Sequence, residues 1–595
     1  MKTNKYIVVA LAGLSLGLSA CNDGDFLTEK PETIYTLENS FNTVDQVQAS
    51  VDNQYQHTRY WFQNNFFLKG IGADYLDTPA WRCGQGSSGT SNYATWSSDY
   101  GTTYGIYEAM YMLVAYCNQT LGGIEQSGLT YDSEAQKNNF IAQSRFFRGF
   151  AYLTLGELFG GVPIVTEFYE IPRYDFTRST RVETYQQAID DLTFAAENLP
   201  DYPQEAGRVG KGAAYHFLAE AYLAQATEEG NNRELLNKSV EAAGRVMGLH
   251  QLMTERFGTR ANPNSTSTVG GVAAYYPDGD VFFDLFQAGN LDREEGNTES
   301  LWVLQNDLGI YHDYGGDQYL AYPRNFSPVL RDTKWKPEYY TQAEIDNGAN
   351  ASPWGGNIDE AQYPGGNTCA YVGGKGVSFT APTQYVIHDI WQGQYEDDMR
   401  NSAVNIRRNF ICLDTKHSMY GQVVTEDMVT DETKDRFYPI WTKFAPVDDY
   451  GYEGVAAGYD GSRDNMYRDD YACRLAETYL IRAEAYLRLG DTQAASEDIN
   501  ALRRRAHCSY EIPASAVDIH TILDERAREL FFEERRWCTL LRMEPDVAVS
   551  QLENHAMYVA DMPVFTGQIN WYLFPFPQAV IDSNTGNLLE QNEGW

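Results

Sequence analysis

Cysteine is scarce in this chain, which has 595 residues and only eight cysteines, none of them in a C-x-x-C pair. Structural zinc sites need Cys or His ligands at short, regular spacings, and no such spacing occurs. With Cys21 set aside, seven cysteines remain, and the sequence does not show how they pair. The sequence therefore predicts no metal site and no cofactor.

Positive charge is also scarce, because 45 Lys and Arg face 82 Asp and Glu, which gives a formal net charge of −37. Nucleic-acid phosphates require a basic surface, so this balance argues against DNA or RNA as a ligand. Long apolar runs are missing as well. After the amino terminus no segment approaches the roughly 18 uninterrupted apolar residues of a membrane-spanning helix.

The amino terminus has the order of a secretory signal. Lys2 and Lys5 precede an apolar run from Tyr6 to Leu18, and Leu18-Ser19-Ala20-Cys21 resembles a lipobox. We expect residues 1–20 to be a signal peptide and Cys21 to be acylated. An ordinary signal peptide cut near Ala20, with Cys21 incidental, is the alternative. Because no later span exists, lipid would be the only anchor.

Helical patterns dominate two blocks of the chain. In residues 141–165, Phe147, Phe150, Thr154 and Leu158 fall at helical spacing before Gly160-Gly161 and Pro163 stop the helix. Thr180 and Glu183 form a capping box for the next helix. Residues 207–226 predict another, alanine-rich helix.

The second block predicts a helical hairpin that turns at Gly490-Asp491, with small residues facing large ones as in a tetratricopeptide repeat. A generic helical hairpin is the alternative. Residues 524–543 (DERARELFFEERRWCTLLRM) predict one further helix.

Four motifs in order resemble the SusD/RagB family, the surface nutrient-binding lipoproteins of Bacteroidetes. They are the lipobox, the R-x-x-R-A-x-x-Y-x-x-L helix with its F-G-x-V-P exit, the E-R-x-x-E-L-x-x-E-x-x-R-W helix and the N-x-x-L-x-Q-N-x-G-W tail. The chain matches the second motif with Arg145, Arg148, Tyr152, Leu155 and Phe159–Val165, with Gly149 in place of alanine. It matches the third with Glu525, Arg526, Glu529, Leu530, Glu533, Arg536 and Trp537. Once a short insertion is allowed, it matches the tail with Pro575, Pro577, Asn587, Leu589, Gln591, Asn592, Gly594 and Trp595.

The resemblance implies a mostly α fold, in which a tetratricopeptide-like hairpin scaffold carries an irregular, loop-rich lobe with short β segments. We expect a signal peptide (1–20), a lipidated tether (21–41), a helical block (42–248), the irregular lobe (249–472) and a carboxy-terminal hairpin and tail (473–595). The resemblance also implies outer-membrane, cell-surface localisation, an oligosaccharide or polysaccharide ligand, and a TonB-dependent transporter of the SusC kind as partner. Peptide capture, as in the RagB branch, is the first alternative.

Catalysis has little support in the sequence. H-E-x-x-H, G-x-S-x-G and a complete phosphate loop are all missing. A glycoside hydrolase, which needs two carboxylates across a sugar, is the remaining enzyme alternative. We expect Glu525, Glu529 and Glu533 to pair with the interleaved arginines 526, 528, 535 and 536 instead. His216 with Glu220 is interpreted as structural. Asp278, Asp280 and Asp284 are interpreted as a solvated turn rather than a calcium site.

Aromatic residues are the strongest sign of binding, with 43 Tyr, 28 Phe and 11 Trp. Sugar rings stack on flat aromatic faces, while Tyr and Trp also offer a polar group. Most aromatics in helices are core, so the candidates lie in loops. We predict as ligand-binding residues Trp81, Arg82, Tyr93, Trp96, Tyr311, Trp335, Tyr339 and Trp354. Trp81, in a Gly- and Ser-rich loop, is the leading candidate, and Trp96 is the weakest because it is expected to pack under the following helix.

Overall fold

The computed structural model describes residues 40–64, 66–70, 73–77, 97–99, 101–258, 268–269, 272–273, 279–287, 289–306, 322–330, 333–349, 378–412, 416–444, 469–555 and 573–595. Helices make up most of this described part, and the strands are short. The predicted mostly α fold class is therefore confirmed. Within these residues no helix combines the length and the apolar character needed to cross a membrane.

Long helices form the first half of the scaffold. The elements are α4 (Val44–Asn64), η1 (Phe66–Lys69), β1 (Leu76–Asp77), α5 (Gly101–Gln126), α6 (Glu134–Phe159), α7 (Arg181–Asn198), α8 (Lys211–Glu228) and α9 (Arg233–Leu249). Helix α8 begins four residues later than the sequence predicts, because Gly207 to Gly210 form the turn that precedes it.

The central lobe is built from short elements, as predicted. They are β2 (Thr268–Val269), β3 (Val272–Ala273), α10 (Val281–Asp284), η5 (Arg293–Glu295), β4 (Ser300–Leu304), α11 (Tyr322–Phe326), η7 (Pro337–Tyr339), α12 (Gln342–Asp346), β5 (Ala381–Pro382), α14 (Gln384–Ile387), η8 (Asp389–Trp391), η9 (Gly393–Tyr395), η10 (Met399–Asn401), β6 (Ile406–Arg407), β7 (Phe410–Ile411), β8 (Val423–Val424), η11 (Glu426–Met428), η12 (Lys434–Arg436) and β9 (Ile440–Trp441).

Helices return in the last part of the chain. The elements are β10 (Asp470–Arg474), α16 (Leu475–Leu489), α17 (Thr492–Arg505), η13 (Ala514–Ala516), α18 (Ile519–Leu530), α19 (Arg536–Leu541), α20 (Pro545–His555) and α21 (Gln578–Ser583). The predicted hairpin is α16 and α17, joined by a turn at Gly490. The prediction of one continuous helix over residues 524–543 is wrong. It breaks into α18 and α19, because Phe532 adopts φ +69° between them.

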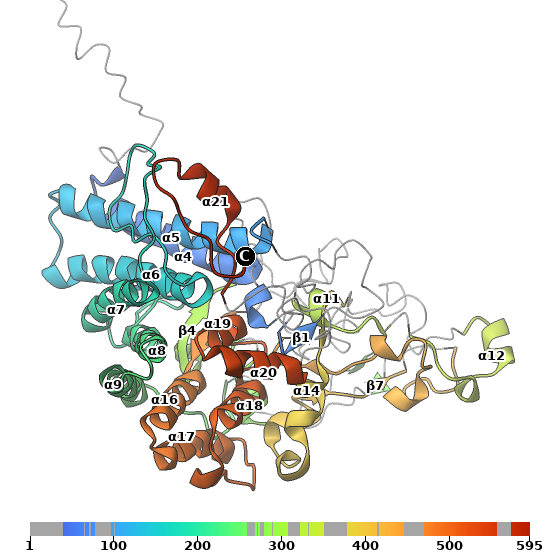
Figure 1. Cartoon of the computed structure of the whole chain (residues 1–595). Coiled ribbons are helices and arrows are strands. Elements are labelled where there is room, and N and C mark those ends of the chain that lie inside the picture. The colour runs from blue at the N-terminus through green and yellow to red at the C-terminus, as the bar shows by residue number, and fades with distance from the viewer. Residues whose placement is uncertain are drawn as a thin grey trace, which may run out of the picture.

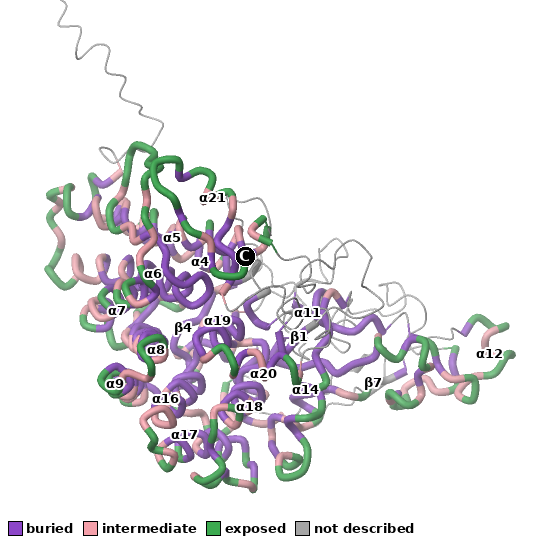
Figure 2. The backbone as a smooth tube through the Cα atoms, viewed as in Figure 1, coloured by how far each residue is buried: buried purple, intermediate pink, exposed green. Residues whose placement is uncertain are grey.

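Successive helices pack side by side to form the scaffold. Contacts join α6 to α7, α7 to α8, α8 to α9, α9 to α16 and α16 to α17. Figure 1 shows these helices following one another along one side of the molecule, while β1, α11, α12 and β7 lie on the other side. Figure 2 shows the inner faces of the helices buried and much of their outer faces exposed. Antiparallel pairing of β10 with β4 connects the lobe to the start of α16.

The helix ends follow the capping signals in the sequence. Thr180 accepts a hydrogen bond from the backbone of Glu183, whose side chain accepts one in return, so the predicted capping box of α7 is confirmed. Helix α6 ends at Gly160, which adopts φ +76°, a conformation that favours glycine. Phe147, Phe150 and Leu158 on α6 are fully buried, as the spacing predicts.

The α6–α7 contact is unusually close at Gly149, where the family pattern has alanine. A Cβ atom at this position would lie 2.8 Å from Cγ of Leu192 and 3.1 Å from the carbonyl oxygen of Ala188. The glycine therefore lets the two helix backbones approach more closely than a side chain would allow.

Candidate ligand-binding site

Most of the predicted ligand-binding residues lie outside the described residues. They are Trp81, Arg82, Tyr93, Trp96, Tyr311 and Trp354. Their roles stay predictions.

The structure describes the other two predicted residues, Trp335 and Tyr339. Trp335 is fully buried, with its ring centroid 4.5 Å from that of His417 and 6.3 Å from that of Tyr339. Its backbone forms a bridge with Val429 that draws this segment into the lobe. Trp335 therefore belongs to the core of the lobe and presents no free face to a sugar. Tyr339 is half-buried at the end of η7.

The described residues just before Trp81 are held firmly. β1 pairs with β5, and the backbone N–H of Thr383 donates to the carbonyl of Tyr75 at 3.0 Å. The hydroxyl of Thr383 donates to the carbonyl of Asp74 at 2.6 Å. The carboxylate of Asp74 accepts from the buried guanidinium of Arg536. The segment with the predicted platform thus follows a rigid strand.

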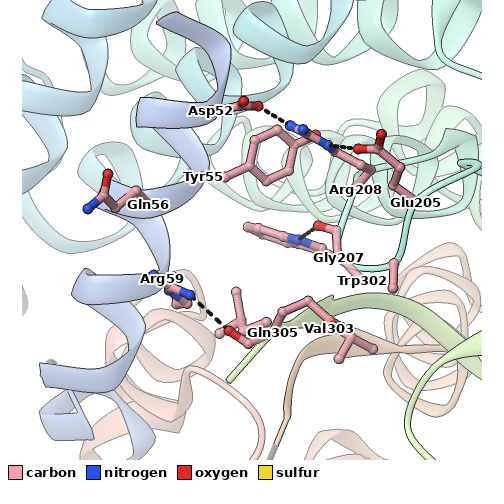
Figure 3. Close-up of a pocket in the computed structure, with 12 residues that line it drawn as sticks. Asp52, Tyr55, Gln56, Arg59, Glu205, Gly207, Arg208, Trp302, Val303 and Gln305 are labelled. Carbon is pink, nitrogen blue, oxygen red and sulfur yellow. Dashed lines mark hydrogen bonds and ion pairs between the residues drawn. The ribbon is translucent and has the colours of Figure 1, made fainter. Parts of the chain in front are cut away.

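A polar pocket of about 500 Å³ opens between α4, the loop before α8 and β4 (Figure 3). The pocket is lined by Asp52, Tyr55, Gln56, Arg59, Glu205, Ala206, Gly207, Arg208, Trp302, Val303, Leu304 and Gln305. Helix α4 supplies its residues from one face, because positions three, four and seven apart lie on the same side of a helix. This is the candidate site, and we call it the α4–β4 pocket.

One rim of the α4–β4 pocket is organised by Arg208. Its guanidinium donates to Asp52 at 2.5 Å and to Glu205 at 3.0 Å, and it lies 4.8 Å from the ring centroid of Tyr55. Asp52 accepts through Oδ1, and its Oδ2 has no hydrogen-bond partner among the described residues. Burial raises the pKa of Tyr55, so its hydroxyl stays protonated.

The floor and the opposite side are fixed by Trp302 and Arg59. The indole N–H of Trp302 donates to the carbonyl of Gly207 at 3.2 Å, and its ring packs among core phenylalanines such as Phe147. Gly207 has φ +77°, and a Cβ there would lie 2.6 Å from Cγ of Gln305. Arg59 donates to the carbonyl of Gln305 at 3.0 Å. Burial lowers the pKa of Arg59 to about 10, which leaves it cationic at neutral pH.

The α4–β4 pocket suits a neutral ligand rich in hydroxyl groups. Its two guanidiniums, on Arg59 and Arg208, balance its two carboxylates, on Asp52 and Glu205, so the lining carries no net charge. A hydroxyl both donates and accepts, and the lining offers cationic donors, carboxylate acceptors and the amides of Gln56 and Gln305.

Sequence reasoning did not find this pocket. Its residues come from three segments separated by about 150 and about 100 positions, so only the fold brings them together. The sole local sign is the polar spacing of Asp52, Gln56 and Arg59 on a helix. That spacing is the same as the spacing of an ordinary solvated face.

The carboxylates that could have suggested a hydrolase are ion-paired, as predicted. Glu529 contacts Arg400, Arg474 and Arg505, and all four side chains are buried. Burial alone would raise the pKa of Glu529, but these guanidiniums outweigh it and hold the pKa well below its ordinary value.

The partners of these carboxylates differ from those predicted. Glu525 contacts Arg400, Arg503 and Arg528, and Glu533 contacts Lys443 and Arg474. Of the interleaved arginines, only Arg528 pairs with this trio. Arg526, on α18 itself, pairs with Glu477 and Glu534. Arg535 and Arg536 follow the break, and they pair with Glu157, Glu220, Asp74 and Glu534.

Two further predictions from the sequence can be compared with the structure. His216 is buried, with Nδ1 2.8 Å from the hydroxyl of Thr478, in line with its structural interpretation.

The prediction of a solvated acidic turn at Asp280 and Asp284 is wrong. Asp280 accepts from Asn405 and caps α10, and Asp284 is buried against Arg256. Asp278 lies outside the described residues. In the described part of the chain, no group of three His, Cys, Asp or Glu could hold a metal ion.

Comparisons with known proteins agree with these features. Residues 342–595 match the model of the SusD family, and residues 25–223 match a model described as starch-binding and associating with the outer membrane. SusD-like protein P2 of Formosa agariphila is 25% identical over 98% of both chains. The starch-binding protein SusD of Bacteroides thetaiotaomicron is 35% identical over 20% of this chain and 21% of its own.

Solved structures share the fold. A SusD homologue from Bacteroides thetaiotaomicron matches 95% of this chain and 100% of its own, with a TM-score of 0.64 and 17% identity. A laminarin-binding SusD-like protein matches 93% of this chain and 100% of its own, with a TM-score of 0.60 and 20% identity. At these low sequence identities, the two matches show only that the fold is shared. Family models at both ends of the chain and a relative along its whole length show that this chain belongs to the SusD/RagB family.

Proposed function

We propose that this protein captures an oligosaccharide at the cell surface and delivers it to a TonB-dependent outer-membrane transporter. The observation that carries the proposal is the α4–β4 pocket, whose balanced guanidinium, carboxylate and amide lining suits a neutral polyhydroxylated ligand. Relatives named as starch-binding and laminarin-binding support the ligand class. The predicted aromatic platform around Trp81 is proposed to stack a sugar ring of the same ligand.

Binding without turnover is part of the proposal. The clustered glutamates of α18 hold arginines in the core, which is a structural role. The experiment screens soluble protein lacking residues 1–21 on a glycan array and, in parallel, against peptide pools. The proposal predicts binding of a glycan family and recovery of that glycan intact. Binding of peptides alone would support the RagB-like alternative, and released shorter sugars would support the hydrolase.

Membrane attachment is proposed to depend on acylation of Cys21. The basic, apolar and Leu-Ser-Ala-Cys order supports it, as does the family description of association with the outer membrane. Several acyl chains together anchor a protein stably, whereas a single chain binds marginally. Cys21→Ala should therefore move most of the protein out of the membrane fraction. An intact mass that shows unmodified Cys21 in native membranes would contradict this.

A further inference from the structure

A second, more apolar groove of about 440 Å³ lies between α5, the extended segment 163–176 and α21. Its lining includes Tyr107, Tyr111, Val114, Phe176, Val580 and Leu589. Figure 1 shows α21 lying beside α5, so a segment near the carboxy terminus covers a helix of the first half of the scaffold at this surface. We call it the α5–α21 groove.

Exposed apolar side chains gather around this groove. Of the eight large hydrophobic residues that the described structure leaves exposed, three lie on segment 163–176, and a fourth is next in sequence to Leu589 of the lining. They are Tyr169, Ile171, Tyr174 and Leu588, with exposed fractions of 37%, 78%, 53% and 78%. Figure 2 shows α21 and the chain around it largely exposed. Soluble proteins rarely leave such a cluster uncovered unless another molecule binds there.

The α5–α21 groove is preformed. The guanidinium of Arg173 is held by both carboxylate oxygens of Asp175 at 2.9 Å and lies 4.9 Å from the ring centroid of Tyr169. The carboxy-terminal segment fixes the other edge, because Asn584 exchanges hydrogen bonds with the backbone of Phe176. The backbone N–H of Gly586 donates to the carbonyl of Tyr174. A partner would therefore meet ordered walls and lose little conformational freedom on the protein side.

The rim of the groove is acidic. Glu167 lines it, and Glu170 and Asp582 lie on the bordering segment 163–176 and on α21. None of the three makes an ion pair with a described residue, whereas Arg173 is neutralised by Asp175. Charge complementarity therefore favours a partner with Lys or Arg beside its apolar side chains. Ile171 and Leu588 are aliphatic, so they offer no ring to stack on a sugar. They are the two most exposed side chains of the cluster, and Arg173 already lies over the Tyr169 ring. A polypeptide with apolar side chains can cover the aliphatic and the aromatic members together, so it is the partner that this surface favours.

The groove also lies close to where the membrane tether joins the body. Phe41 is buried against Gly123 of α5, where a Cβ would lie 2.4 Å from the Phe41 ring. Val114 in the groove is nine residues earlier on the same helix, about 14 Å away along its axis. Only residues 22–39 separate Cys21 from the described chain, and 18 residues span at most about 65 Å. A lipid on Cys21 would thus hold the Phe41 end of α5 within about 65 Å of the membrane surface.

We propose that the α5–α21 groove docks an extracellular segment of the outer-membrane transporter, with apolar side chains flanked by basic ones. The inference rests on the proposed function, which supplies the anchor and the transporter. It adds the surface on this chain that holds the transporter and the chemistry of the segment that fits there.

Site-specific photocrosslinking in native outer membranes tests the proposal. p-Benzoylphenylalanine replaces Ile171 or Leu588, and Val423, which is 39% exposed on β8 of the lobe, is the matched control. After irradiation the crosslinked protein and peptide are identified by mass spectrometry. The expected result is one TonB-dependent transporter, crosslinked from both groove positions at least about tenfold more than from Val423, through a segment with apolar and basic residues.

A double variant, Ile171→Asp with Leu588→Asp, measures the consequence for binding. Both side chains are exposed, so folding should be retained and thermal melting should confirm it. Co-purification of the transporter should fall at least tenfold, while Val423→Asp leaves it unchanged. Equal crosslinking from all three positions, or crosslinks only to a second copy of this chain or to lipopolysaccharide, would overturn the proposal. Glycan affinity, measured on the same variants, separates this outcome from failure of the proposed function, because it should not change.

Discussion

At the scale of single residues, the most consequential feature is a buried network of carboxylates and guanidiniums. Glu529 on α18 contacts Arg400 of the lobe, Arg474 of β10 and Arg505 of α17. Glu299, just before β4, also contacts Arg474 and Arg505. One glutamate therefore connects the hairpin with the irregular lobe. The sequence predicted pairing for this residue but not its complete burial.

Glu529→Gln should consequently destabilise the fold strongly. The amide keeps the shape but leaves three buried arginines short of one negative charge, and removal of one partner from a buried pair costs about 3–5 kcal/mol. Urea unfolding at neutral pH measures this change. Glu497→Gln is the matched control, because Glu497 is exposed and, among the described residues, its one ion pair is with Arg504 at 3.6 Å. A surface pair of this kind contributes at most about 1 kcal/mol. Equal effects of the two substitutions would contradict the assigned role.

The same network predicts loss of stability in acid. Burial opposes ionisation of Glu525, but the guanidiniums of Arg400, Arg503 and Arg528 lower its pKa to about 2. The pKa of Glu477 is also about 2, where burial is outweighed by His216 and Arg526. A carboxylate with a lowered folded pKa stabilises the fold above its unfolded pKa of about 4.5 and loses that effect as pH falls towards 2.

The contribution of the network to the unfolding free energy should therefore be retained above about pH 5 and decline steadily between pH 4.5 and 2. Glu157 acts in the opposite direction, because burial raises its pKa to about 7. The stability that it contributes in its neutral form is lost as the pH rises from about 4.5 to 7. Urea unfolding at a series of pH values separates the two ranges. An unfolding free energy that is unchanged from pH 5 to pH 3 would show that the network contributes nothing to stability.

At the scale of elements, close helix packing at Gly149 gives a direct test. Gly149→Ala should destabilise the protein by about 1–3 kcal/mol, because the added methyl would lie against Leu192 and the Ala188 carbonyl. Helix propensity alone predicts the opposite sign, a gain of about 1 kcal/mol. Gly244→Ala in α9 is the control, since nothing lies within 4 Å of its added Cβ, and it should gain stability. Thermal melting compares the two variants, and a stabilised Gly149→Ala would refute the close approach of α6 and α7.

The elements also show what the sequence could and could not predict. Helix α7 has its capping box, and the hairpin of α16 and α17 turns at Gly490, because these signals are local. The break at Phe532 was missed, because its ring packs 4.5 Å from Phe326 and 4.6 Å from Phe444, residues of the distant lobe. The helical pattern runs through the break, and only tertiary contacts reveal it.

The candidate site was predicted less well, for the same reason. Trp335 follows loop-like residues in the sequence, yet its bridge to Val429 buries it. Arg59 and Gln305 meet in the α4–β4 pocket although 246 positions separate them. A sequence shows which residues can bind a sugar, but their convergence depends on the fold.

At the scale of the whole molecule, a helical scaffold on one side carries an irregular lobe on the other (Figure 1). Buried ion pairs fix the lobe to the scaffold. Ligand capture is proposed for the α4–β4 pocket with the platform around Trp81, and transporter docking for the α5–α21 groove. Separate surfaces for the two tasks would let the protein hold glycan and transporter at the same time.

The central claim, that this protein binds oligosaccharide through the α4–β4 pocket, is tested most directly by calorimetric titration with the best glycan from the array. Arg59→Ala, Gln56→Ala and Trp81→Ala should each weaken binding at least about tenfold, or about 1.4 kcal/mol. Arg245 is an exposed residue of α9 whose ion-pair partner among the described residues is Glu241, and Arg245→Ala should bind like the wild type. Thermal melting of every variant accompanies the titrations. Unchanged affinity in both Arg59→Ala and Gln56→Ala, with folding intact, would contradict the claim and place the glycan elsewhere on the molecule.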